Sequence, residues 1–221
     1  MKNQVSDNPV KNRDNSVFWL TITACLLVTL YLTSNIMAVK VINIFGITLF
    51  DAGTIIFPLS YMLGDALTEI WGFKTTKKII ILTFICNIFM ITLTYIGIFL
   101  PSPDYMAEVS DAYETVFAYT PRIIIASLIA FLTGELLNAW SMEKIKSKTG
   151  DKLLWVRTIG SSTLGHLTDT VIFVCIAFLG VSPAGDLISM IVIQYIAKLG
   201  IEAICGTPLA YGIVKYIKKK I

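Results

Sequence analysis

Long apolar runs separated by short polar segments form the main pattern of this sequence. A run of about 20 apolar residues is long enough to cross the hydrocarbon core of a bilayer as a helix. Six such runs occur, at residues 17–38, 51–71, 78–100, 122–142, 158–180 and about 188–212. The pattern predicts an all-α integral membrane protein with six transmembrane helices in one domain, residues 17–221. The polar residues 1–16 are expected to form a disordered tail.

The composition supports a membrane protein and narrows its partners. Hydrophobic residues make up 55% of the chain and charged residues 15%, whereas about 25% of an ordinary soluble domain is charged. The net charge of +3 comes from short basic clusters between apolar runs, a pattern that indicates no nucleic-acid partner. The four cysteines are scattered through the apolar runs without paired spacing. We therefore expect no disulfide, no metal site and no cofactor.

Basic residues are concentrated in alternate connections between the runs. Lys and Arg number three in residues 1–16, three in residues 73–78, five from Lys144 to Arg157 and four from Lys215 onward. The connection 101–120 instead holds four acidic residues and no basic one. Because cytoplasmic connections carry the excess of Lys and Arg, we expect both termini in the cytoplasm and residues 101–120 outside.

Six formal charges and the single histidine interrupt four of the apolar runs. One charge at the centre of a transmembrane helix costs about 2.5 to 3.5 kcal/mol. Six unpaired charges would cost on the order of 15 to 20 kcal/mol, more than a typical folding stability. These side chains are therefore expected to face a paired or hydrated interior. They are Asp65, Glu69, Glu135, His166, Asp169, Lys198 and Glu202, with Asn138 close to Glu135.

The interrupting residues allow more than one role. Asp65, Glu135 and Asp169 lie deep in their runs without a basic residue one turn away, so we interpret them as binding carboxylates. Lys198 and Glu202 have the spacing of an ion pair on one helix and equally of two site residues. His166 suits a hydrogen-bonded core residue and a site residue equally well.

Asp65 and Glu69 form the most unusual pair in the sequence. They lie one helical turn apart on the same face, and they repel each other when both are ionised. Either one of them carries a proton, or a cation from another helix neutralises the pair. The candidate cations are Lys40, Arg157 and Lys198. A third interpretation lets Glu69 extend to the cytoplasmic boundary near Trp71.

Two halves of three helices each can be compared along the chain. Asn35 and Asn138 both lie near the end of the first run of their half, and Gly64 and Gly165 begin the similar segments GDALTE and GHLTDT. Since three is an odd number of crossings, such a repeat would be inverted across the membrane. An inverted repeat and chance similarity both account for this short match.

Four segments carry a resemblance to a known family. They are SNIMAVK (34–40), FPLSYMLGDALTEIWG (57–72), PRIIIASLIAFLTGELLN (121–138) and RTIGSSTLGHLTDTVIF (157–173). Their ordered combination of N-x4-K, D-x3-E, G-E-x2-N and R-x3-S-x7-D resembles the queuosine precursor transporter family. These are six-helix proteins of the bacterial inner membrane, once grouped as vitamin uptake transporters. The resemblance extends from about residue 17 to the end of the chain.

The resemblance implies import of a 7-deazaguanine base, namely preQ0, preQ1 or queuine, for modification of tRNA. A guanine-like edge offers adjacent N–H donors to a carboxylate and a carbonyl to Asn or Lys, and its flat ring suits an aromatic platform such as Tyr61 or Phe173. The expected substrate-binding residues are Asn35, Lys40, Tyr61, Asp65, Glu69, Glu135, Asn138, Arg157, Ser161, Asp169 and Phe173. Lys198, Glu202 and His166 are expected to act in an ion pair or in coupling. The sequence leaves open which base is taken, whether an ion is coupled and whether the protein forms a homodimer.

Two other classes of protein compete with this interpretation. One is the substrate-capturing subunit of an ATP-driven vitamin importer; this chain has no G-x4-G-K-[ST] loop, and its first run lacks the Ala-x3-Ala face with which such subunits commonly dock. The other is an intramembrane aspartyl protease that uses Asp65 and Asp169, but the Tyr-Asp and Gly-x-Gly-Asp motifs are missing from the sequence. We therefore expect a self-sufficient carrier and not an enzyme.

Overall fold

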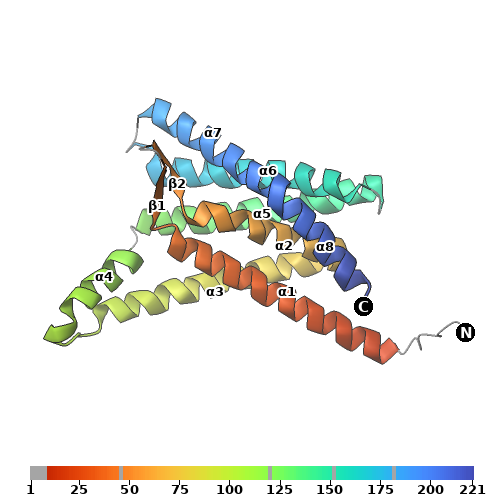
Figure 1. The fold of residues 1–221 in the computed structure, drawn as a ribbon, viewed down its shortest axis with the longest axis horizontal. Helices are drawn as coiled ribbons and strands as arrows, with labels where there is room; N and C mark the ends of the chain where they lie inside the picture. The colour runs from red at the N-terminus through yellow and green to blue at the C-terminus, as the bar shows by residue number, and fades with distance from the viewer. Residues whose placement is uncertain (1–8, 45–46, 119–120, 151–152, 181–182) are drawn as a thin grey trace, which may run out of the picture.

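A computed structural model describes residues 9–44, 47–118, 121–150, 153–180 and 183–221 (Figure 1). Helices form nearly all of it. The helices are α1 (Pro9–Met37), α2 (Gly53–Trp71), α3 (Phe73–Phe99), η1 (Asp104–Met106), α4 (Ala107–Phe117), α5 (Pro121–Thr149), α6 (Leu154–Phe178), α7 (Ala184–Ile201), η2 (Glu202–Gly206) and α8 (Thr207–Lys218). Two strands, β1 (Val41–Ile44) and β2 (Ile47–Asp51), pair antiparallel between α1 and α2. The helical fold class is as predicted, with this hairpin added in a connection.

Five helices of the described chain are long and apolar enough to cross a membrane. They lie at Asn12–Met37, Phe73–Phe99, Arg122–Thr149, Leu154–Phe178 and Leu187–Lys218. The last combines α7 and α8 through η2, a turn of π-helix. α1 begins at Pro9, within the segment predicted as a disordered tail, and residues 1–8 lie outside the described residues.

α2 is an additional 19-residue helix and holds the centre of the molecule. Every residue from Ser60 to Glu69 is buried, the two carboxylates included. α2 packs against α1, α3, α5, α7 and α8, so its polar face meets protein on several sides. The chain reverses from α2 into α3 at Gly72. This residue has a φ of +78°, a backbone conformation that glycine adopts at no steric cost.

The outer surface of the bundle is apolar, as a lipid-facing surface must be. On α3 the exposed side chains include Leu82, Phe89 and Leu93, which are 50%, 63% and 62% exposed. Its buried side is short and carries Thr76, Thr83 and Asn87. From Ile79 to Phe99 α3 holds no charged residue, so it forms an apolar outer wall of the bundle.

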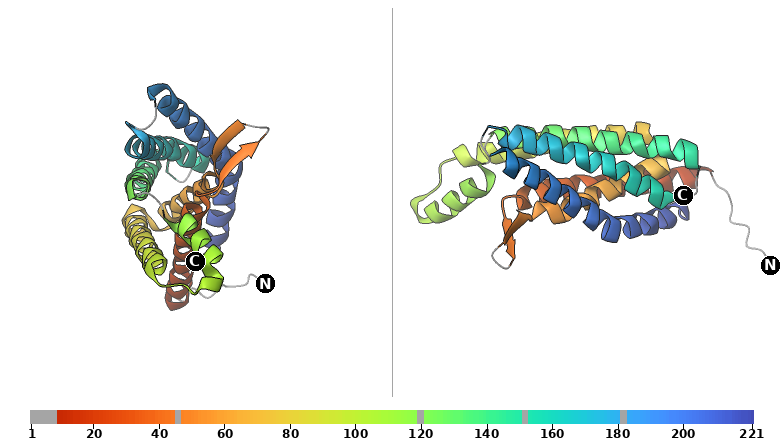
Figure 2. Two further views of the ribbon diagram at one scale, coloured as in Figure 1. Left: turned by 90° about the vertical axis from the view of Figure 1, so that its left-hand side faces the viewer. Right: turned by 90° about the horizontal axis from the view of Figure 1, so that it is seen from above.

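The two ends of the bundle differ. The hairpin and α4 lie together at one end, whereas α1 begins and α8 ends at the other (Figures 1 and 2). A hydrogen bond of 3.1 Å from the Asn15 amide to the Lys220 carbonyl oxygen joins the two chain ends. Asn15 and Lys220 therefore lie at the same end of the bundle, and the side of the membrane that this end faces stays a prediction. The predicted external connection 101–120 contains η1 and α4.

α5 and α6 form the most extensive helix pair of the bundle. Two glycines let their backbones approach closely. A Cβ atom on Gly134 would lie 2.8 Å from Cβ of Asp169 and 3.0 Å from the Gly165 carbonyl oxygen. A Cβ on Gly165 would lie 2.8 Å from Cβ of Asn138. Any larger side chain at either position would force the two helices apart.

Candidate functional site

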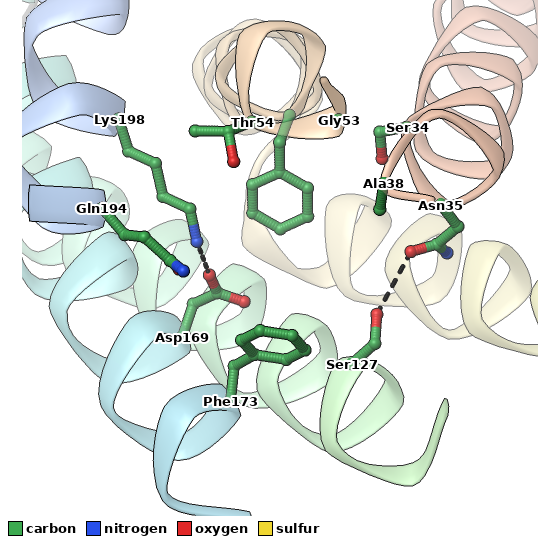
Figure 3. A pocket seen from close by; sticks show the side chains of 11 residues that line it. Ser34, Asn35, Ala38, Gly53, Thr54, Ser127, Asp169, Phe173, Gln194 and Lys198 are labelled. Atoms are coloured by element: carbon green, nitrogen blue, oxygen red, sulfur yellow. Dashed lines mark hydrogen bonds and ion pairs between the residues drawn. The ribbon is translucent and has the colours of Figure 1, made fainter. Parts of the chain in front are cut away.

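A pocket opens between α1, α2, α5, α6 and α7 in the half of the bundle that carries the hairpin (Figure 3). Polar and aromatic side chains from all five helices meet in it. The lining consists of Ser34, Asn35, Ala38, Gly53, Thr54, Phe57, Ser127, Asp169, Phe173, Gln194 and Lys198.

A buried ion pair forms one wall of the pocket. Lys198 Nζ of α7 lies 2.5 Å from Asp169 Oδ2 of α6 and 3.3 Å from the Thr170 hydroxyl (Figure 3). The ammonium group also lies 4.8 Å from the centre of the Phe57 ring, within the range of a cation–π contact. This wall therefore offers a carboxylate acceptor and an ammonium donor side by side.

The opposite wall carries an amide and a hydroxyl. The Ser127 hydroxyl donates to Asn35 Oδ1 over 3.1 Å, joining α5 to α1 (Figure 3). The Phe173 ring lies between this pair and Asp169. A second, more apolar hollow is also lined by Asn35, Ser127 and Phe173, and it reaches Asn87 of α3.

Below the pocket lies a layer of buried polar side chains. Asn138 donates to Asp65 Oδ1 over 2.8 Å, and the Ser162 hydroxyl lies 3.4 Å from Asn138 Oδ1. Ser162 and His166 both contact the carboxylate of Glu202 in η2. The ring of Tyr61 lies 4.2 Å from the His166 ring, centroid to centroid. Residues from α2, α5, α6 and η2 thus form one connected polar layer.

A cationic cluster surrounds Glu69 at the end of the bundle where the termini lie. Arg157 of α6, whose side chain is 1% exposed, lies 3.0 Å from Glu69 Oε2. Lys146 of α5 and Lys218 of α8 lie 3.2 and 3.0 Å from Oε1. The cluster ties three helices to α2. Arg157 is one of the three cations named as partners for Asp65 and Glu69, so the repulsion between these carboxylates is relieved at Glu69.

The predicted site residues fall into separate groups. Four line the pocket: Asn35, Asp169, Phe173 and Lys198. Six lie in the polar layer or directly beside it: Tyr61, Asp65, Glu135, Asn138, His166 and Glu202. Glu69 and Arg157 belong to the cationic cluster. The remaining two lie apart, because Ser161 packs on Met142 with its oxygen 3.9 Å from the sulfur, and Lys40 is exposed just before β1.

Lys198 and Glu202 do not form the ion pair that was one of the two roles expected of them. Lys198 pairs with Asp169 and Glu202 with His166, both on α6. The Glu202 backbone N–H still bonds to the Lys198 carbonyl oxygen, so the two residues are one α-helical turn apart, and the π-helical turn begins only at Glu202. Each side chain nevertheless meets its partner across the helix interface and not along its own helix.

Several pocket residues had no role in the sequence prediction. Thr54 and Phe57 lie on the face of α2 that holds Tyr61 and Asp65, and Ser127 lies two turns before Glu135 on α5. Helical spacing from the predicted carboxylates could have identified all three. Ser34 carried no signal other than its place beside Asn35.

Most of this site lies in a segment that matches a known protein family. The model of a family described as "Putative vitamin uptake transporter" matches residues 51–213. The chain belongs to this family. The match covers α2 through most of α8, and so includes all of the polar layer, the Glu69 cluster except Lys218, and most of the pocket. Family membership and the apolar helices together make the protein a multi-pass membrane transporter.

Curated relatives give the family a more specific character. A protein of Bacillus subtilis (strain 168) named "Probable queuosine precursor transporter" is 31% identical over 187 residues, which cover 83% of this chain and 80% of that protein. A Haemophilus influenzae protein of the same name is 29% identical, covering 73% and 67% of the two chains. The "Queuosine precursor transporter" of Escherichia coli (strain K12) is 24% identical, covering 75% and 70%. No solved structure matches the chain.

Proposed function

We propose that this protein imports a queuosine precursor, one of preQ0, preQ1 or queuine, across the bacterial cytoplasmic membrane for tRNA modification. The observation that carries the proposal is the pocket in which Asp169, Lys198 and Phe173 converge from α6 and α7. The names of three relatives support the same class of substrate.

The chemistry of the pocket suits a 7-deazaguanine base. Asp169 uses one carboxylate oxygen for Lys198, and its other oxygen can accept from the adjacent ring N–H and exocyclic amine of a guanine-like edge. Lys198, Gln194 or Asn35 can donate to the ring carbonyl. Phe57 and Phe173 supply aromatic faces for a flat ring. The polar layer beneath the pocket then holds Asp169 and its helix in place through α5 and α2.

The orientation that we propose places the pocket in the outer half of the membrane. Lys and Arg gather at the end where α1 begins and α8 ends, which favours the cytoplasm for that end. α2 would be the sixth crossing, shielded from lipid by the helices around it. The inverted repeat that relates Asn35 to Asn138 and Gly64 to Gly165 remains part of the proposal. In this frame the Glu69 cluster closes the cytoplasmic side beneath the pocket.

A self-sufficient carrier fits this arrangement better than a subunit of an ATP-driven importer or an enzyme. The relatives are named as transporters without mention of a partner. Asp65 and Asp169, the carboxylates that a protease would need, have separate partners: Asp169 pairs with Lys198, and Asp65 accepts from Asn138. A carboxylate fixed by an ammonium group is poorly suited to share a proton with a second aspartate.

Uptake in cells tests the proposal. The protein is produced in bacteria that can neither make nor import queuosine precursors, and each of labelled preQ0, preQ1 and queuine is supplied at low concentration. Queuosine in tRNA is the readout. The expected result is that at least one base restores queuosine with the parent protein and fails with Asp169→Asn. If the parent restores no more queuosine than the empty vector with any of the three bases, the proposal is overturned.

A further inference from the structure

The buried carboxylates of this protein differ sharply in their partners. Glu69 has Arg157 and two lysines, Asp169 has Lys198, and Glu202 has His166 and Ser162. Asp65 accepts one hydrogen bond from Asn138, and its second oxygen has no partner among the described residues. Glu135 is 0% exposed, and neither of its oxygens has a partner in the described chain.

Glu135 and Asp65 lie at the same level between α5 and α2. Oε2 of Glu135 lies 2.8 Å from the point where a Cβ atom on Gly64 would stand, directly before Asp65 in the chain. The glycine therefore makes room for this carboxyl group against the α2 backbone. Two ionised carboxylates at this depth without a cation would cost several kcal/mol each.

The charges around Glu135 do not supply that cation. α2 presents Asp65 and Tyr61, and α6 presents Asp169. η2 presents Glu202, whose negative charge repels one on Glu135. Lys198 of α7 is occupied by Asp169, His166 by Glu202, and α3 buries only uncharged residues against the bundle. The cationic cluster lies one turn further along α2, at Glu69.

We propose that Glu135 and Asp65 form a proton-binding site, and that a proton carried there couples substrate uptake to the proton gradient. The inference rests on the proposed function and adds its driving force. On the outer side, a carboxylate takes a proton from water and becomes a neutral carboxylic acid. On the inner side, the same group returns the proton to water, so the cycle transfers one proton per substrate without other chemistry.

The pocket and the proton site are close enough to act on each other. A Cβ atom on Gly134, the residue before Glu135, would lie 2.8 Å from Asp169 Cβ and directly against the Tyr61 hydroxyl. Asp169 thus connects the pocket wall to the backbone that carries Glu135. A substrate that donates hydrogen bonds to the Asp169 carboxylate changes the negative charge that Glu135 faces. Binding of substrate in the pocket and binding of a proton at Glu135 and Asp65 are thereby linked.

Glu69 is excluded from this role by its partners. Arg157, Lys146 and Lys218 form ion pairs with its two oxygens, whereas Asp65 has no cationic partner among the described residues. Glu69 fixes the helix bundle, and Asp65 remains available to a proton.

Purified protein in liposomes tests the coupling. The vesicles contain a pH-sensitive dye, and labelled precursor is supplied with an inward proton gradient, an inward sodium gradient or no gradient. The parent is expected to accumulate substrate at least tenfold with the proton gradient alone, and substrate addition is expected to acidify the interior. Glu135→Gln, which imitates the protonated state, should lose both accumulation and acidification. Glu143→Gln, an exposed position on the same helix, is the matched control.

The outcomes separate the coupling from the proposed function. Exchange of substrate by the parent without gradient-driven accumulation, or accumulation driven by sodium, would overturn the proton site and leave the transport function intact. Absence of both exchange and accumulation in the parent would overturn both. If Glu135→Gln does not fold, acidification on substrate addition in the parent still decides, because a transporter without proton coupling produces none.

Discussion

Lys198 on α7 and Asp169 on α6 form an ion pair with Nζ and Oδ2 2.5 Å apart, and both side chains are more than nine-tenths buried. The pair joins two helices at the wall of the pocket. A buried pair of this kind is weak evidence for stability, because desolvation offsets much of the attraction. We propose that the pair serves substrate binding, and measurements of uptake and of stability on the same variants separate this role from a structural one.

Asp169→Asn should lower uptake at least tenfold and also destabilise the protein. The amide presents donor hydrogens where the substrate has donors, and it leaves the Lys198 ammonium without its anion. The cost of an unpaired buried charge is about 3 to 5 kcal/mol. Uptake and thermal unfolding in detergent are measured together. In the double variant Asp169→Asn with Lys198→Met, stability should recover while uptake does not; recovery of uptake as well would show that the carboxylate does not read the substrate.

Phe173→Ala should weaken substrate binding without loss of fold. Stacking of a base on an aromatic ring contributes about 1 to 3 kcal/mol, which corresponds to a rise of about 5- to 150-fold in the substrate concentration for half-maximal uptake. Phe89→Ala on α3, where the ring is 63% exposed on the outer surface, provides the control. Equal effects of the two substitutions would remove Phe173 from the site.

Arg157→Gln and Lys218→Gln should differ in their effect on stability although both remove a cation from Glu69. Arg157 is 1% exposed at its side chain and Lys218 is 43% exposed. Solvent screens the lysine contact, so its loss should cost less than about 1 kcal/mol, whereas loss of Arg157 removes a buried partner and should cost about 3 kcal/mol or more. Thermal unfolding of the detergent-solubilised variants measures both. Similar losses for the two would show that Arg157 is not the main partner of Glu69.

The proposed orientation is tested with single cysteines in a variant that lacks the four native ones. A cysteine in place of Ser110 on α4 should react with a membrane-impermeant thiol reagent added to intact cells. A cysteine in place of Ser147 near the end of α5 should react only after the cells are opened. The opposite pattern would reverse the orientation, and with it the side from which the pocket fills.

The apolar runs and the residues that interrupt them were predictable from the sequence, because a charge in a bilayer has to face the protein interior. The helices at Phe73–Phe99 and Leu154–Phe178 follow the predicted runs closely. The partner of each charge was not predictable. Spacing along one helix favoured Lys198 with Glu202, whereas packing between helices paired Lys198 with Asp169. Side chains that meet across an interface depend on helix rotation and depth, which hydropathy does not encode.

The close approach of α5 and α6 at Gly134 and Gly165 limits how a carrier of this shape can move. The backbones of the two helices are already in contact there, so rotation or sliding of one past the other would cause a clash. We therefore expect α5 and α6 to move together as one rigid body. A cycle that exposes the pocket first to one side and then to the other must pass its motion to α1–α2 and to the α7–α8 arm. The π-helical turn at Glu202–Gly206 joins α7 to α8, and we expect this motion to occur there. Its first residue, Glu202, contacts His166 of α6.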